Sequence, residues 1–208
     1  MAFRGWPAEA LEFFDGLAVD NSKVYWTAHR QVYDDKVFAP MAALVAELEN
    51  EFGPGKIFRP YRDVRFSADK SPYKTEIAAT LERGGYLRLD AHGLGAGAGM
   101  YMMDRDELVR FRGAVDAEPS GRALDAVVDD LARQKIDVRG HERLARVPRG
   151  FASDHPRAEL LKCKGLIAWE EWPAGAWLGR ASARDRVLKF LRATRPLNEW
   201  LATHVGAA

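Results

Sequence analysis

Patterns typical of β-strands lie together in the middle of the sequence, and patterns typical of helices lie on both sides of them. The strand patterns alternate apolar and polar residues with a period of two. Strands that run together, rather than alternating one for one with helices, favour an α+β fold over a doubly wound one. The sequence therefore predicts a mostly antiparallel central sheet with helices packed around it. The expected strands are 57–66, 75–81, 86–90 and 97–103.

Helix-spaced apolar residues and capping signals place the helices. The second helix carries one apolar stripe from Trp26 to Leu48, in which Pro40 predicts a kink or a break. Asp104 and Glu107 have the spacing of a capping box. The predicted helices begin near Pro7, Asn21–Ser22, Asp104, Ser120, Asp154–Pro156, Ser182 and Pro196, and short strands are predicted between Ile136 and Phe151.

The size and composition of the chain favour one globular domain over residues 1–208. Its hydrophobic residues at 47% and charged residues at 29% are close to globular averages, and a chain of 208 residues needs no disulfides for stability. No apolar run approaches the roughly 18 residues of a membrane span. Cys163 is the single cysteine, which excludes an internal disulfide and a cysteine metal cluster. The sequence therefore predicts a cytoplasmic protein that does not associate with membranes.

One short segment, Arg59–Thr75, departs from the overall charge balance. The whole chain has a net charge of +1, which gives no reason to expect duplex nucleic acid as a partner. Within the segment five cations face two carboxylates, a local charge of +3. The cations are Arg59, Arg62, Arg65, Lys70 and Lys74, and the carboxylates are Asp63 and Asp69. This excess predicts a small anionic ligand as the partner of the segment.

The same segment carries side chains suited to phosphate or carboxylate. Arginine recognises these groups through two parallel hydrogen bonds, lysine adds a point charge, and tyrosine offers a hydroxyl or a ring. Arg62 falls on the apolar face of the predicted strand, where it needs a carboxylate or a ligand anion. A set of structural ion pairs that bridge sheet and helix is the alternative interpretation. The predicted ligand-binding residues are Arg62, Arg65, Lys70, Tyr73, Lys74 and Trp26.

The pattern specifies a ligand charge but no reaction. Asp63 and Asp69 are candidates for an acid or base, and His155 lies beside Asp154 at a predicted helix start, where a neutral base or a capping role is expected. The histidines lack the spacing of a metal site, so neither a metal nor a cofactor is predicted. Alternating glycines at 93–99 indicate close packing rather than a ligand-binding floor or a dinucleotide loop.

Two functions are compatible with these residues. In the first, the protein is an enzyme or a binding protein for a small phosphate- or carboxylate-bearing ligand. In the second, it is a non-catalytic interaction module whose cations hold a protein tail or single-stranded nucleic acid. Nucleic acid of this kind is bound through bases stacked on aromatic rings, for which Trp26, Tyr61 and Tyr73 are the candidates.

Several of these motifs together resemble a known family. They are Tyr61–Ser67, Asp69–Lys70, Pro72–Thr75, Phe13–Phe14, Asn21 with Trp26, Pro148–Phe151 and His155–Pro156. In these residues the chain is similar, over nearly its whole length, to the family catalogued as domain of unknown function 2461. The resemblance implies a single-domain α+β protein without an assigned activity, and it supports the choice of Arg59–Thr75 as the site. Family members often carry Trp-Phe where this chain has Trp26–Thr27, which weakens any role for a second ring there.

Overall fold

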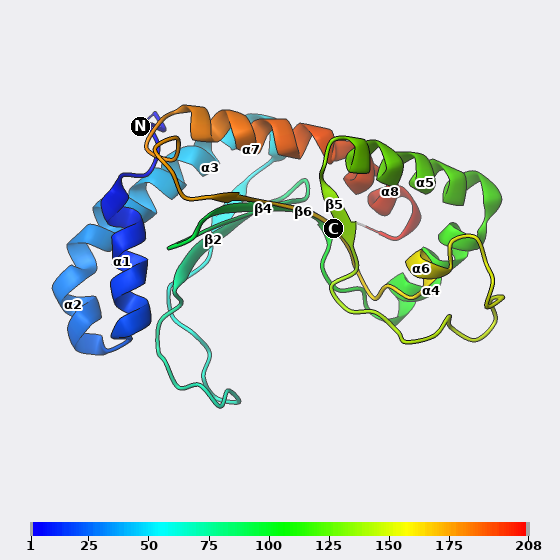
Figure 1. The fold of residues 1–208 in the computed structure, drawn as a ribbon, viewed down its shortest axis with the longest axis horizontal. Coiled ribbons are helices and arrows are strands. Elements are labelled where there is room, and N and C mark those ends of the chain that lie inside the picture. Colours follow the sequence, from blue (N-terminus) through cyan, green and yellow to red (C-terminus); the bar gives the residue numbers. More distant parts are fainter. Residues whose placement is uncertain (1, 207–208) are drawn as a thin grey trace. The chain divides into compact units, whose positions relative to one another are not determined.

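The structure is a computed structural model that describes residues 2–206. It contains a six-stranded antiparallel sheet and helices (Figure 1). The strands are β1 (Gly55–Ile57), β2 (Glu76–Leu81), β3 (Gly85–Asp90), β4 (Gly93–Met100), β5 (Asp137–Arg139) and β6 (Leu166–Pro173). Their hydrogen-bonded order is β1-β2-β3-β4-β6-β5. The predicted α+β class is confirmed.

The helical elements precede and follow the main group of strands, as the sequence predicts. They are α1 (Ala8–Val19), α2 (Lys23–Val32), the π-helix η1 (Tyr33–Phe38), α3 (Ala39–Phe52), α4 (Arg105–Asp116), α5 (Glu118–Arg133), α6 (Ala158–Leu161), α7 (Ser182–Ala193) and α8 (Arg195–His204).

The chain divides into two compact units. The first comprises the residues up to Glu82 together with 86–96 and 171–189, and the second comprises 83–85, 97–170 and the residues from Phe190 onward. Strands β4 and β6 each contribute residues to both units. The assignment of residues 1–208 to one domain stays a prediction.

In the first unit, α3 packs on β1 and β2, and α1, α2 and η1 pack on one another. The apolar stripe expected from Trp26 to Leu48 is buried. The irregularity expected at Pro40 takes the form of the π-helical turn that precedes it. In this turn the backbone N–H of Ala39 donates to Asp34 O, five residues back. Proline has no N–H to donate, so a change of hydrogen-bond register just before it is physically reasonable.

In the second unit, α4, α5 and α8 pack on one another, and α5 also packs on β5. The predicted capping box of Asp104 and Glu107 is confirmed at the start of α4. The cap predicted at Ser120 is wrong, because α5 begins at Glu118 and the Ser120 hydroxyl donates to Ala114 O at 2.6 Å. The helix expected at Asp154–Pro156 begins later and is the single turn α6.

The predicted strand over 57–66 is wrong. The ladder between β1 and β2 ends where Ile57 pairs with Ala79, and the chain then leaves the sheet. Pro60 lacks the N–H that a strand would use, and Phe66, expected on an apolar face, is 96% exposed. The alternating pattern in this segment therefore has no sheet to pair with. Strand β6 was not predicted at all.

The close packing predicted for the alternating glycines is confirmed. A Cβ atom on Gly93 would lie 2.2 Å from the carbonyl oxygen of Trp172, and one on Gly99 would lie 2.3 Å from that of Leu166. Both glycines also have positive φ angles, which side chains disfavour. The glycines of β4 therefore let the backbone of β6 approach.

Two further observations concern solvent and membrane exposure. Among residues 2–206, every helix is too short or too polar to cross a bilayer. Cys163 is buried, and burial raises the pKa of its thiol.

Candidate functional site

The segment Arg59–Thr75, which we call the cationic loop, connects β1 to β2 and projects from the sheet of the first unit (Figure 1). Its two limbs are joined at the base by a β-bridge between Tyr61 and Tyr73. The loop therefore extends the β1–β2 hairpin, and its two limbs are held together at the base. Two backbone hydrogen bonds flank the bridge, from Arg62 N–H to Pro72 O at 2.9 Å and from Lys74 N–H to Pro60 O at 2.8 Å.

Asn21 fastens the base of the loop to the start of α2. Its side-chain amide donates to Tyr73 O at 3.1 Å, and its side-chain oxygen accepts from Tyr73 N–H at 3.0 Å. The next residue, Ser22, caps α2 by accepting from Tyr25 N–H. The helix start and the loop base are thus held by adjacent residues.

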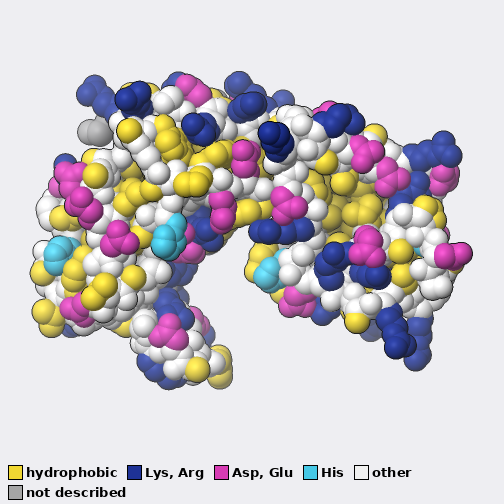
Figure 2. Space-filling view, viewed as in Figure 1, with side chains coloured by type: hydrophobic (Ala, Val, Ile, Leu, Met, Phe, Trp, Pro, Cys, Tyr) yellow, Lys and Arg dark blue, Asp and Glu magenta, His cyan; other side chains and the backbone are white. Residues whose placement is uncertain are grey.

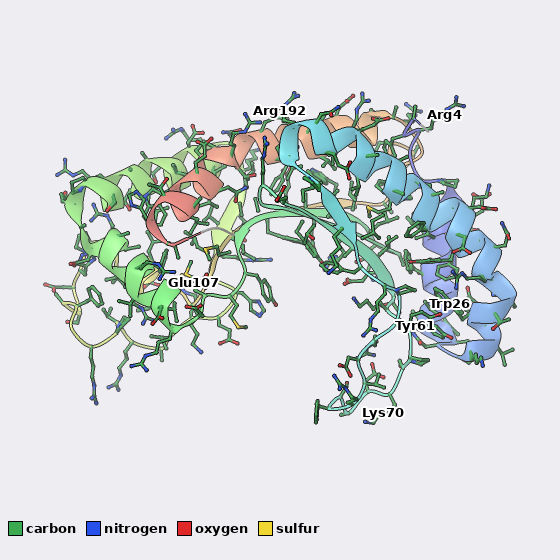
Figure 3. The ribbon with its side chains drawn as sticks, turned by 180° about the vertical axis from the view of Figure 1, so that it is seen from behind. Arg4, Trp26, Tyr61, Lys70, Glu107 and Arg192 are labelled. Atoms are coloured by element: carbon green, nitrogen blue, oxygen red, sulfur yellow. The ribbon has the colours of Figure 1, made fainter. Side chains whose placement is uncertain are left out.

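Aromatic rings fix the same base against α2 and η1. The ring of Tyr73 stacks on Trp26, with centroids 4.4 Å apart and planes 7° apart, and Tyr33 lies 4.8 Å from Trp26. Trp26 and Tyr73 are 4% and 6% exposed, whereas Tyr61 is 45% exposed. Figure 3 shows Tyr61 beside Trp26 at the base and Lys70 at the far end of the loop. Of the rings predicted to stack on a ligand, Tyr61 is the accessible one.

Two of the predicted ligand-binding arginines form ion pairs inside the loop. Arg62 pairs with Asp69. Arg65 contacts Asp63 through two groups, Nε to Oδ1 at 2.9 Å and Nη2 to Oδ2 at 2.6 Å, while its side chain stays 77% exposed. The opposite charges are intermixed on the loop surface (Figure 2). Each arginine therefore pairs with one of the two carboxylates of the loop.

The remaining three cations have no carboxylate partner within residues 2–206. Lys70 Nζ donates to Val64 O at 2.9 Å, and Lys74 Nζ lies 5.3 Å from the centroid of the Phe58 ring. Arg59 forms no ion pair with any described residue. These three side chains account for the +3 excess of the loop.

The two carboxylates of the loop remain ionised at neutral pH. Hydrogen bonds from Ser71 and then from Arg62 hold the pKa of Asp69 well below its usual range, and hydrogen bonds from Arg65 lower the pKa of Asp63. An acid or base works best when its pKa lies near the working pH. Both carboxylates are therefore poorly suited to act as an acid or a base near neutral pH.

His155, the other catalytic candidate, belongs to the second unit. Its Nδ1 accepts from the backbone N–H of Arg157 at 2.9 Å, so the ring proton is on Nε2, which lies 3.3 Å from Asp116 Oδ1. With both nitrogens engaged, the imidazole has no free lone pair to act as a base. His155 does not cap α6, because the N-cap residue is Arg157 and the His155 ring accepts from the backbone N–H of that residue, one position before the helix.

Arg30 and Tyr33 lie against the Trp26 ring, although neither was predicted as a site residue. The Arg30 guanidinium carbon lies 5.7 Å from the Trp26 ring centroid, and Nε donates to both oxygens of Asp34 at 2.9 and 2.8 Å. Burial raises the pKa of Tyr33 to about 12. The signal in the sequence was the four-residue spacing of Trp26, Arg30 and Asp34, which places them along one helix face.

Comparison with known proteins identifies the family. The model of the family described as "Conserved hypothetical protein (DUF2461)" matches residues 9–200. The chain belongs to this family. Among solved structures, it is similar to a conserved hypothetical protein from Pyrococcus furiosus with 11% identity and a TM-score of 0.39, over 83% of this chain and 97% of the other. Among curated proteins there is no significant match.

Proposed function

We propose that this member of the DUF2461 family binds an anionic ligand at the cationic loop. The observation that supports this most directly is that Arg59, Lys70 and Lys74 form no ion pair with a carboxylate among residues 2–206. Because these cations lie on one short loop and form no ion pair with the described residues, they attract a phosphate- or carboxylate-bearing ligand. A small ligand of this type is the first candidate.

The side chains have distinct roles in the proposed complex. Lys70 uses one of its three donors on a backbone carbonyl, and Lys74 faces a neutral ring, so both ammonium groups retain donors for a ligand oxygen. On binding, Arg62 and Arg65 release the carboxylates of the loop and pair with the anionic group of the ligand instead. Tyr73 and Trp26 act indirectly, because their stacked rings hold the base of the loop.

A macromolecular partner is the second candidate. The loop projects from the sheet, and the exposed ring of Phe66 gives it an apolar contact that a small anion does not require. This favours a non-catalytic module that holds a protein tail or single-stranded nucleic acid. For both candidates we propose a cytoplasmic location, which the single buried thiol of Cys163 supports.

The test is a thermal-shift screen with phosphorylated metabolites, nucleotides and dicarboxylates. We expect at least one compound to raise Tm in the native protein and to lose this effect when Arg59, Lys70 and Lys74 are all changed to alanine. These three residues form no ion pair with the described chain, so the triple variant is expected to fold.

The control variant changes Lys36, Arg146 and Arg149 to alanine. These three exposed residues lie outside the loop, and the substitution gives the same net charge as the triple loop variant. We expect a compound that raises Tm of the native protein to raise Tm of this control variant as well. Equal losses in the two variants, or no stabilisation by any compound, would contradict the proposed function.

A further inference from the structure

The exposed ring of Tyr61 is the outer member of an otherwise buried aromatic cluster. Its centroid lies 6.1 Å from that of Trp26 and 5.5 Å from that of Tyr73. Both neighbours are almost fully buried. A ring fixed in this way before binding loses little conformational entropy when a planar group stacks on its open side.

A guanidinium with unused donors lies near this ring. Arg30 bonds Asp34 through Nε, and within residues 2–206 its two terminal Nη groups donate no hydrogen bond. Its guanidinium carbon lies 5.7 Å from the centroid of the Trp26 ring, and the Trp26 ring is also a neighbour of Tyr61. The base of the loop therefore combines an open aromatic face with a guanidinium that is available to a ligand.

Cations that form no ion pair with residues 2–206 lie on both limbs of the loop close to Tyr61. Arg59 precedes Tyr61 by two residues, and Lys74 bonds through its backbone to Pro60 on the opposite limb. A ligand whose ring stacks on Tyr61 would thus place an attached anionic group within reach of these cations.

The pairing of ring and guanidinium is repeated further along the loop. The ring of Phe66 is 96% exposed, and the guanidinium carbon of Arg65 lies 5.9 Å from its centroid. Exposed rings interleaved with cations are the arrangement that proteins use to bind bases and phosphates together. A small carboxylate ligand would use the cations but would leave both rings without a role.

From this geometry we propose that the ligand of the cationic loop is a nucleotide, whose base stacks on Tyr61 beside Arg30 and whose phosphate lies on the loop cations. This inference rests on the proposed function and specifies its ligand. A free mononucleotide and a single-stranded nucleic acid share this chemistry. If the ligand is a single-stranded nucleic acid, a second base would stack on the ring of Phe66.

The test uses ligand pairs that differ by the base alone. One pair is a fluorescein-labelled strand of ten thymidines and an abasic strand of the same length and charge, and the other is AMP and ribose 5-phosphate. We expect the ligand with bases to bind about five- to 150-fold more tightly within at least one pair. A difference confined to the strands identifies nucleic acid as the source, and a difference between AMP and ribose 5-phosphate identifies a mononucleotide.

Substitutions at Tyr61 locate the effect. Tyr61→Leu is expected to weaken the base-containing ligand about five- to 150-fold and to leave its base-free partner unchanged, while Tyr61→Phe retains binding. Tyr101→Leu, which removes another exposed ring in the second unit, is the matched control and should change neither. Near-UV circular dichroism verifies that each variant is folded.

The outcomes separate this inference from the proposed function. If both members of each pair bind equally and the Arg59, Lys70 and Lys74 triple variant abolishes that binding, the nucleotide is wrong and the anion site stands. If none of the four ligands binds, the nucleotide is wrong, and the proposed function then depends on the thermal-shift screen alone. If Tyr61→Leu has no effect on a base-dependent difference, the stacking position is wrong.

Discussion

Arginines and carboxylates meet in two regions of this molecule with opposite consequences. In the second unit, Arg157 is buried and donates from Nε to Asp125 at 2.6 Å and from both Nη groups to Glu118 at 3.2 Å. Two carboxylates thus surround one guanidinium. In the cationic loop of the first unit, five cations share two carboxylates, and the ion pairs are exposed to solvent.

The difference shows how to distinguish a structural ion-pair network from a binding surface. Removing a covered guanidinium that is paired with carboxylates leaves those groups short of a partner and destabilises the fold, and its engaged donors have little to offer a ligand. Exposed pairs contribute little stability, because water screens them and their side chains lose entropy on pairing. The loop instead owes its position to Asn21, Trp26 and Tyr73 at its base, which leaves its charges free for another role.

The largest effect is expected from removing the ring that holds the loop. Trp26→Ala deletes a buried side chain that stacks on Tyr73 and contacts Tyr33, and it should lower the free energy of unfolding by about 3–5 kcal/mol. Urea unfolding measures this loss. A loss below about 1 kcal/mol would show that the aromatic cluster does not anchor the base.

Replacing one arginine by methionine in each region tests whether the two kinds of ion pair contribute differently to stability. Arg157→Met leaves Asp125 without its partner, while Glu118 keeps its ion pair with Arg122. The substitution should lower the free energy of unfolding by about 2–3 kcal/mol, less than for a deep pair because both carboxylates still reach water. Arg65→Met should leave the urea midpoint unchanged. Equal losses in the two variants would remove the distinction between network and loop.

The smallest expected effect concerns the phenol behind the loop base. Because burial raises the pKa of Tyr33 to about 12, unfolding releases a proton between pH 10 and 12. The contribution of Tyr33 to stability is therefore complete below pH 10, and about 2 kcal/mol of it is lost as the pH rises to 12. Tyr33→Phe should show a correspondingly smaller loss in urea unfolding across this range. An identical pH dependence would mean that Tyr33 titrates normally.

Much of the fold was predictable because it depends on local signals. The capping box at Asp104, the apolar stripe from Trp26 to Leu48 and the close approach at the glycines of β4 all follow from residue types at fixed spacings. The segment 57–66 was mispredicted because alternation shows which side chains share a face, but not whether a neighbouring strand exists. Strand β6 was missed because its three-residue spacing of Trp169 and Trp172 concealed the alternation.

The candidate site was predictable in composition but not in geometry. The charge excess located the cationic loop, and counting charges gave its magnitude. The sequence did not show that Arg62 and Arg65 take the loop's own carboxylates, since pairing depends on where each limb turns. The contribution of Arg30 depends on a helix that is distant in sequence from the loop, so it required the structure.

The state of Cys163 makes the loop easy to study in solution. A covered thiol with a raised pKa is largely protonated at pH 7 and reacts slowly with maleimides. A cysteine introduced in place of the exposed Phe66 would therefore accept a fluorophore or spin label selectively in the otherwise native chain. Such a label would report directly on the motion of the loop and on its contacts with a partner.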